Sequence, residues 1–332
     1  MKVVIRADGG GSVGWGHLSR CAALAEVLIE ADTTVLWACR SEPAIEKFTG
    51  APPALALSGA PTMGPLPVAE AATVSAFAAN ADWIFVDHYG ADEAYLAALR
   101  TDSAARVMVF DDHQVRHGAD LRLAPTQAEG PKTLAGPAYQ PIRPCFTRTP
   151  HAAQRSGWLL ALGGADPQND TVACVSELQG GTPLLVLASD AIAERQDLDA
   201  SLSTTSQRVA WMTPENLAQA LSSSAAALVS SSTLSWEALA MGAPIVALQT
   251  ADNQVGVVTT LREAGVPVFT DATAAAAALR DGLARRADPA AKLDGLGAWR
   301  VARAMGAQVD LEHEGGLPVH PSEQEISKGS KG

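Results

Sequence analysis

Short apolar runs alternate along this chain with longer segments of helical periodicity. In the first half, the runs at 83–87 and 107–111 are apolar throughout and close with an aspartate. Such runs are typical of parallel strands that are buried on both faces, with their carboxyl ends lining a crevice. Shorter runs at 3–5 and 34–38 predict two more strands, and the segment 17–31 predicts the helix between them.

A second series of strands follows the proline-marked stretch 137–150. Its expected strands lie at 158–162, 184–187, 209–211, 226–229, 245–248 and 266–269. Two such series predict an α/β protein of two doubly wound, Rossmann-like domains with a ligand in the cleft between them. We place these domains at 1–147 and 156–310, with a hinge near 145–157. The polar segment 311–332 is expected to be a disordered tail.

Composition narrows the range of ligands. The 332 residues carry 24 Lys and Arg against 36 Asp and Glu, a net charge of −12. Without a basic stripe, this balance argues against binding to nucleic acid or to an anionic membrane. Any bound phosphate is therefore expected to rest on backbone N–H groups and helix N-termini.

Cysteine usage and the absence of targeting segments suggest a location. No CxxC pair occurs among Cys21, Cys39, Cys145 and Cys174. Neither a zinc site nor a disulfide framework is expected, which fits a reducing cytoplasm. We find no signal peptide and no apolar run long enough to span a membrane.

The first chemical motif joins a strand to a helix through a glycine-rich loop. Residues 6–17 read RADGGGSVGWGH and include Gly9, Gly10 and Gly14. Such a loop directs backbone N–H groups toward an anion, but it matches neither the dinucleotide-binding nor the Walker pattern. His17 begins the helix and is the expected general base. The alternative is a tightly packed glycine turn with His17 as a structural cap.

Polar residues also follow two later strands. Asp87, His88 and Tyr89 are positioned to contact a ligand, although a capping aspartate with a half-buried tyrosine is the plainer interpretation. The run 111–113, which ends in His113, resembles a cluster of metal ligands. Carboxylates at a strand end more often cap the next helix, so we expect no metal there.

The second half carries a glycine pair and then a serine-rich motif. Gly164 follows Gly163 and lets the backbone approach a ligand, and Asn169 or Thr171 is expected to cap the next helix. Residues 230–233, which include Ser232 and Thr233, predict a pyrophosphate cradle at a helix start. Glu237, one turn further on, is suited to accept hydrogen bonds from ribose hydroxyls. Three more polar residues follow the next strand at the cleft, namely Asp252, Asn253 and Gln254. The alternative is a serine-rich cap and a solvated glutamate.

Taken together, these motifs resemble the PseG/SpsG family of UDP-sugar hydrolases from the pseudaminic acid pathway. The resemblance rests on RADGGGSVGWGHLSRCAALA, VDHYGAD, GGADPQNDT and SSSTLSWEALAMGAPIVALQTADNQ, in that order. It implies the GT-B fold of the MurG-like glycosyltransferases, with a UDP-sugar bound between the domains. It also implies an inverting cleavage of the C1–O bond that releases UDP and needs neither metal nor separate cofactor.

The resemblance further assigns roles to individual residues. The resemblance implies that His17 is the base and that Tyr89 holds sugar or water. It implies that the glycines at 9–11 and 14 contact the diphosphate or sugar. It also implies that Glu237 binds ribose and that Asn253 binds sugar or phosphate. An arginine such as Arg6, Arg20 or Arg143 could pair with a carboxylate on the sugar, or equally serve as a surface or interdomain charge.

The chain departs from the family pattern on its N-terminal side. Trp15 stands where the family usually has threonine, and the segments 111–117 and 136–146 differ as well. A tryptophan beside the base adds an apolar face that can stack on a planar acceptor. The leading hypothesis is therefore glycosyl transfer to a small planar molecule such as a nucleobase, as a cytosylglucuronate synthase performs in nucleoside-antibiotic biosynthesis. The acceptor side would comprise Trp15, Asp87, His88 and His113.

Two alternatives remain open. One is a PseG-like hydrolase of a UDP-2,4-diacetamido-2,4,6-trideoxy sugar, in which water is the acceptor. The other is an inactive nucleotide-sugar-binding module, against which the joint presence of His17, Tyr89, Glu237 and Asn253 argues.

Overall fold

A computed structural model describes most of the chain. The described residues are 1–10, 13–40, 42–101, 103–111, 118–150, 152–163, 166, 168–188, 198, 201–202, 206–209, 213–288 and 293–311. The expected tail therefore lies outside the described residues from 312 onward, and so do Gly164 and His113.

The first half of the chain forms one parallel sheet. Among the described residues it has seven strands in the order β3-β2-β1-β4-β5-β6-β7. Their bounds are β1 (Lys2–Ala7), β2 (Thr34–Cys39), β3 (Leu55–Ala56), β4 (Trp83–Asp87), β5 (Arg106–Phe110), β6 (Leu121–Ala124) and β7 (Thr133–Ala135). Chain order reverses at β1 and β4, and the carboxyl ends of these neighbouring strands define a crevice.

The second half repeats this architecture. Its sheet has six strands within the described part, in the order β10-β9-β8-β11-β12-β13. Their bounds are β8 (Trp158–Ala161), β9 (Leu184–Leu187), β10 (Ser206–Val209), β11 (Ala226–Ser230), β12 (Ile245–Leu248) and β13 (Val268–Phe269). The reversal falls at β8 and β11, so the serine-rich motif after β11 opens onto the second crevice.

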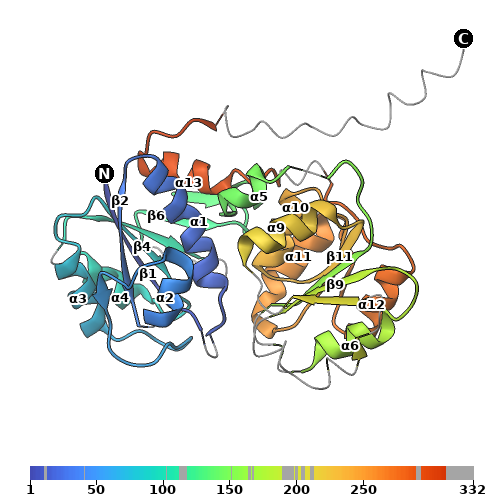
Figure 1. The fold of residues 1–332 in the computed structure, drawn as a ribbon. Helices are drawn as coiled ribbons and strands as arrows, with labels where there is room; N and C mark the ends of the chain where they lie inside the picture. The colour runs from blue at the N-terminus through green and yellow to red at the C-terminus, as the bar shows by residue number, and fades with distance from the viewer. Residues whose placement is uncertain are drawn as a thin grey trace, which may run out of the picture.

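Helices cover both faces of each sheet, and Figure 1 shows the two resulting units side by side. The helices of the first half are α1 (Gly16–Glu30), α2 (Glu42–Thr49), α3 (Val68–Phe77), α4 (Glu93–Leu99), the 3₁₀ turn η2 (Pro137–Tyr139) and α5 (Pro144–Arg148). Those of the second half are α6 (Asp170–Glu177), α9 (Pro214–Ser223), α10 (Thr233–Ala240), the 3₁₀ turn η3 (Asp252–Gln254), α11 (Val255–Glu263), α12 (Ala272–Arg280) and α13 (Gly297–Met305).

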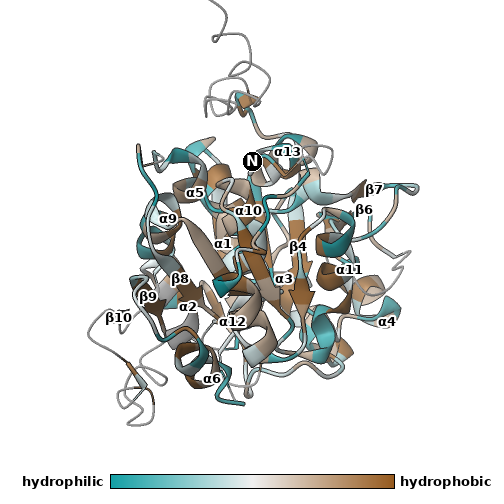
Figure 2. Cartoon of the chain, turned by 90° about the vertical axis from the view of Figure 1, so that its right-hand side faces the viewer, coloured by the Kyte–Doolittle hydropathy of each residue, from teal (hydrophilic) through white to brown (hydrophobic). Residues whose placement is uncertain are grey.

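Alternate residues of each central strand enter opposite cores. In β1, Val3 and Ile5 pack under α1, whereas Val4 packs under α3 and α4. This two-sided burial is why the strands are apolar throughout, and Figure 2 shows β4 as a brown, hydrophobic strand in the interior.

The last helix crosses back to the first unit. Residues of α13 join the core beneath α1, and the indole Nε1–H of Trp83 donates a 2.8 Å hydrogen bond to the carbonyl of Met305. Residues 296–309 thus pack with the first sheet, although the expected boundary places them in the domain 156–310. The helix has an apolar stripe, and its sequence alone does not reveal which unit this stripe covers.

Most expected strands are present, with differences at the sheet edges. The strand expected at 209–211 begins earlier, at Ser206, and 210–212 lie outside the described residues. The sequence did not predict β3, β6 or β7, which are all short strands. In β6, Arg122 also interrupts the apolar run. These strands extend the first sheet beyond β2 and β5.

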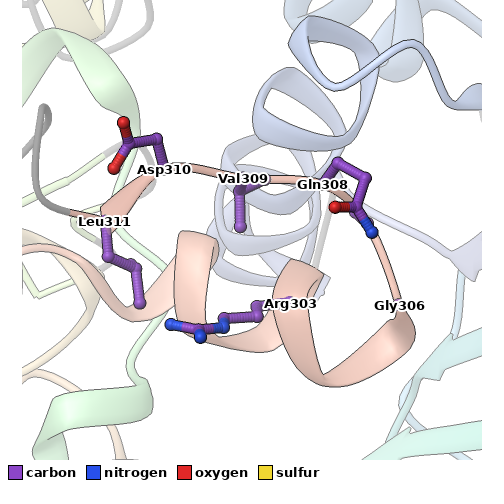
Figure 3. A pocket seen from close by; sticks show the side chains of 7 residues that line it. Arg303, Gly306, Gln308, Val309, Asp310 and Leu311 are labelled. Atoms are coloured by element: carbon purple, nitrogen blue, oxygen red, sulfur yellow. The ribbon is translucent and has the colours of Figure 1, made fainter.

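A cavity of about 590 Å³ lies beside the end of α13, away from every motif singled out in the sequence. It is lined by Arg303 and residues 306–311, and Figure 3 shows Arg303 facing Val309 and Leu311. In the described part of the chain, no helix is both long and apolar enough to cross a membrane.

Candidate active site

The glycine loop brings the first helix close to the second unit. Gly10 and Gly14 have φ of +88° and +76°, and the N–H of Gly10 donates to the carbonyl of Gly14 at 2.9 Å. A Cβ on Gly9 would lie 2.5 Å from Leu18 Cδ1, so Gly9 is required for packing against α1. The glycine-turn interpretation therefore accounts for Gly9, while the space beside Gly14 is open.

Two faces of α1 serve the site. His17 and Arg20, one turn apart, point to the end of β4. Gly16 and Ser19, also one turn apart, approach α10 of the second unit: a Cβ on Gly16 would lie 3.6 Å from Thr233 Oγ1. A single helix thus connects the expected base to the expected donor-binding helix.

His17 is held by Asp87. The imidazole Nδ1 lies 2.6 Å from Asp87 Oδ1, and both side chains are almost completely buried. Burial by itself would raise the pKa of Asp87, but the charge of Arg20 and the hydrogen bonds from His17 and Arg20 hold it below its usual value. An ionised carboxylate only accepts hydrogen bonds, so the proton of neutral His17 resides on Nδ1 and the Nε2 lone pair is left to act as a base.

Tyr89 and His88 occupy different environments, although they are adjacent. The ring of Tyr89 meets the His17 ring edge-on, with centroids 4.6 Å apart. His88 is 3% exposed; its Nδ1 accepts from the N–H of Gly90 and its Nε2 donates to the carbonyl of Thr62. Burial and the nearby Arg6 charge lower the pKa of His88 to about 4. Asp87 and His88 are therefore buried and bonded to other protein groups, instead of being exposed to an acceptor as expected.

The start of α10 has the features of an anion site. Ser232 caps the helix by accepting from the N–H of Leu234 at 3.3 Å, and its hydroxyl also bonds Ser230. The hydroxyl of Ser231 is fully buried, with no hydrogen-bond partner among the described residues. Thr233 lies next to Gly16, so the N-termini of α1 and α10 converge. Two positive helix ends aimed at one place favour a negatively charged group between them.

Glu237 is enclosed between the two units. It is 3% exposed, and Ser19 Oγ donates to its Oε1 at 3.4 Å. Burial raises the pKa of Glu237 to about 8, and the Arg143 charge and the Ser19 hydrogen bond offset only part of this effect. Glu237, the residue expected to bind ribose, therefore lies one turn after the start of α10, as the sequence indicated. Helix α1 covers its side chain.

The segment after β12 borders the cleft. Asp252 and Asn253 are exposed in η3, whereas Gln254 bonds the N–H and hydroxyl of Thr250 and so shapes the turn. Just beyond, a Cβ on Gly256 would lie 3.1 Å from Thr126 Oγ1 of the first unit. This is a second close approach between the units, on the side of the β6–β7 loop.

Trp15 is half-buried and lies two residues before His17. Its ring lies 5.8 Å from that of Phe48 on α2, with the planes 35° apart. The two rings form an aromatic pair that was not anticipated, because 33 positions separate them in the sequence. Of the residues expected on the acceptor side, Trp15 therefore packs against an aromatic ring of α2.

Several other assignments change in the structure. At the start of α6, the side chain of Asp166 accepts from the N–H groups of Asp170 and Thr171, whereas Asn169, which directly precedes the helix with a φ of +61°, makes no cap hydrogen bond through its side chain. The three arginines considered for a sugar carboxylate all pair with protein carboxylates: Arg6 with Asp8 and Glu70, Arg20 with Asp87, and Arg143 with Glu26. In the described part of the chain, no group of three or more His, Cys, Asp or Glu side chains is arranged to hold a metal ion.

Comparisons with known proteins show what this chain resembles in sequence and in fold. No protein-family model matches the chain. A UDP-2,4-diacetamido-2,4,6-trideoxy-β-L-altropyranose hydrolase from Campylobacter jejuni is 23% identical over 289 residues, covering 81% of this chain and 98% of the hydrolase. The expected similarity to PseG-type hydrolases is thereby confirmed.

Solved structures confirm the fold. MurG from Acinetobacter baumannii superposes with a TM-score of 0.60 at 14% identity, covering 93% of this chain and all of that one. The UDP-GlcNAc 2-epimerase of Methanocaldococcus jannaschii, solved with UDP-GlcNAc and UDP, gives 0.59 at 12% identity, covering 92% and 99%. The spinosyn rhamnosyltransferase SpnG, solved with spinosyn aglycone, gives 0.55 at 16%, covering 92% and 96%. The chain has the GT-B fold.

Proposed function

We propose that this chain is an inverting, UDP-sugar-dependent enzyme that breaks the anomeric C1–O bond and releases UDP. The observation that carries the proposal is the His17–Asp87 pair: His17 Nδ1 lies 2.6 Å from Asp87 Oδ1 at the end of β4, and His17 belongs to the helix that approaches the N-terminus of α10. A diphosphate between the two helix ends would place the attached sugar beside Nε2 of His17. That nitrogen then removes a proton from the attacking group as the bond to C1 forms.

The acceptor that we favour is a small planar molecule, such as a nucleobase. Trp15, two residues before the base in the sequence, forms a half-buried aromatic pair with Phe48, which is the kind of surface on which a flat heterocycle stacks. In this reaction His17 takes the proton from the acceptor nitrogen or oxygen, the acceptor bonds to C1, and UDP leaves with the electrons of the C1–O bond.

The second candidate is hydrolysis, with water as the acceptor. It is favoured by the similarity to the Campylobacter hydrolase, which extends over nearly the whole of that protein. In this case Trp15 and Phe48 only pack the loop against α2, and Tyr89 is the side chain placed to hold the water.

The deciding experiment is UDP release from a panel of UDP-sugars, including UDP-glucuronic acid, with and without free nucleobases. Transfer predicts UDP only with an acceptor, together with a sugar–base adduct in the mass spectrum. Hydrolysis predicts UDP and free sugar from the donor alone. Trp15→Thr should raise the KM for a planar acceptor under the first proposal and leave donor hydrolysis unchanged under the second.

Two variants test the assigned residues. His17→Ala should lose turnover by about 10²- to 10⁴-fold, as expected of a general base, while the Kd for UDP stays unchanged. Glu237→Ala should weaken UDP binding instead. Activity that survives in His17→Ala would remove His17 from the role of base.

A further inference from the structure

Arg20 lies at the centre of the site in a geometry that its sequence position did not reveal. Its Nε donates to Asp87 Oδ2 at 2.5 Å and its Nη2 to Asp87 Oδ1 at 2.6 Å, a bidentate pair. The same Nη2 lies 2.9 Å from Nδ1 of His17. The guanidinium also lies 3.9 Å from the centroid of the Phe110 ring, which fixes its plane.

This geometry makes Asp87 Oδ1 a shared acceptor. It receives both the Nδ1–H of His17 and an N–H of Arg20, and Oδ2 accepts from Arg20 Nε and, at 3.5 Å, from the Cys21 thiol, so the carboxylate cannot rotate without breaking these hydrogen bonds. Arg20 also places a positive charge directly beside the imidazole. An Asp–His pair without such a cation would stabilise the imidazolium more strongly and hold the accepted proton more tightly.

We propose that Arg20 is a positioning residue for the base: it fixes Asp87 and counteracts its charge, so that His17 stays unprotonated and releases its proton after each turnover. The proposal rests on the proposed function, in which His17 is the base. It assigns Arg20 no contact with the substrate.

The other groups facing His17 leave this balance to Asp87 and Arg20. On α1, burial and the Asp87 charge raise the pKa of the Cys21 thiol, so it is neutral. After β4, His88 is neutral at pH 7 because burial lowers its pKa to about 4, and Tyr89 contacts His17 through its ring. At the end of β1, Arg6 and Asp8 form a buried ion pair with each other.

Glu237 belongs to α10 of the second unit, and its carboxyl group accepts a hydrogen bond from Ser19 on α1. Burial raises the pKa of Glu237 to about 8, so its carboxyl is mainly protonated at pH 7. It therefore adds little charge near His17.

The test compares Arg20→Met and Arg20→Lys with the wild type in the full-length protein. In Arg20→Met the acidic limb of the kcat–pH profile should move to higher pH by about one unit, because Asp87 then stabilises the imidazolium unopposed. At a pH on that limb, kcat should fall about tenfold. Arg20→Lys keeps the positive charge and should restore the limb to near its original position, although it lacks the bidentate geometry.

A second readout does not depend on turnover. In isotope-labelled protein, the His17 ring resonance, assigned by its loss in His17→Gln, should titrate at higher pH in Arg20→Met than in the wild type. The control is Arg106→Met, which removes a guanidinium lying 4.0 Å from the Trp83 ring at the opposite end of the sheet. It should leave the His17 titration unchanged.

The outcomes separate the two proposals. If Arg20→Met raises the donor or acceptor KM and leaves both the limb and the resonance in place, Arg20 binds substrate and the positioning role is overturned. An equal titration in wild type and Arg20→Met overturns it as well. If His17→Ala remains active, the proposed base fails, whereas the resonance still reports whether Arg20 controls the charge on His17.

Discussion

Asp87 illustrates what a single residue's sequence context conceals. The glycine-rich motif was enough to predict His17 as a base, but an aspartate at a strand end suits a cap and a ligand equally well. Its partner lies 70 residues away on α1, and only the packing of α1 on β4 brings the two together. Arg20 was ambiguous for the same reason, since a lone arginine on a helix could pair with any nearby carboxylate.

Asp87→Asn should reduce kcat by about 10²- to 10⁴-fold without changing the Kd for UDP. An amide can present its N–H to Nδ1, which favours the tautomer with the proton on Nε2 and removes the base. Steady-state kinetics together with calorimetric UDP titration would test this expectation. A kcat close to that of the wild type would contradict the orientation assigned to His17.

Glu237→Gln should change how stability depends on pH. The carboxyl has a pKa of about 8 when folded, against 4.5 as its ordinary value, so the folded state favours the protonated form. The wild type should therefore lose stability as pH rises from about 5 to about 8, whereas the glutamine variant carries no such loss at this position. Melting temperatures of both proteins across this range should diverge; parallel curves would show that Glu237 is not desolvated.

At the level of elements, apolar runs predicted the central strands well and the edges poorly. Strands β1, β4, β8 and β11 are buried on both faces and therefore carry the strongest pattern. Strand β6 lies next to an edge strand and carries Arg122, so it has no comparable signal. Helix caps were predicted by residue type, and α6 shows the limit of that approach, because backbone geometry selected Asp166 over Asn169.

Ser232→Ala should destabilise the protein by about 1 kcal/mol, because the N-cap of α10 loses its side-chain acceptor. Under the proposed function it should also weaken UDP binding. Thr213→Ala is a matched control, since Thr213 caps α9 in the same way through the N–H of Asn216. It should cost similar stability in denaturant unfolding and leave UDP affinity alone; an equal loss of affinity in both variants would count against a donor site at α10.

For the whole molecule, the two-unit α/β architecture followed from the sequence, but the path of the chain between the units did not. Two segments connect them, one through α5 and one before α13, and they lie against each other. A Cβ on Gly295 would lie 2.6 Å from Thr147 Cγ2. The amphipathic pattern of α13 predicts a buried face, yet either unit could have received it.

Gly297→Ala should destabilise the protein severely. A Cβ at this position would lie 2.0 Å from the backbone oxygen of Gln140, and backbone cannot move aside as a flexible side chain can. Gly181→Ala, where nothing lies within 4 Å, is the control. Thermal unfolding should show a large drop in Tm for the first variant and almost none for the second, and equal Tm values would mean that α13 does not dock as described.

The return of α13 also sets an order for events on the ribosome. The second sheet is drawn from a continuous stretch, 158–269, whereas the core beneath α1 needs residues 296–307, which are synthesised last. The first half of the chain emerges first but waits with Trp83 and its neighbours uncovered until α13 is translated. Although domains generally fold from the N-terminus onward during synthesis, this chain should complete its second unit before its first.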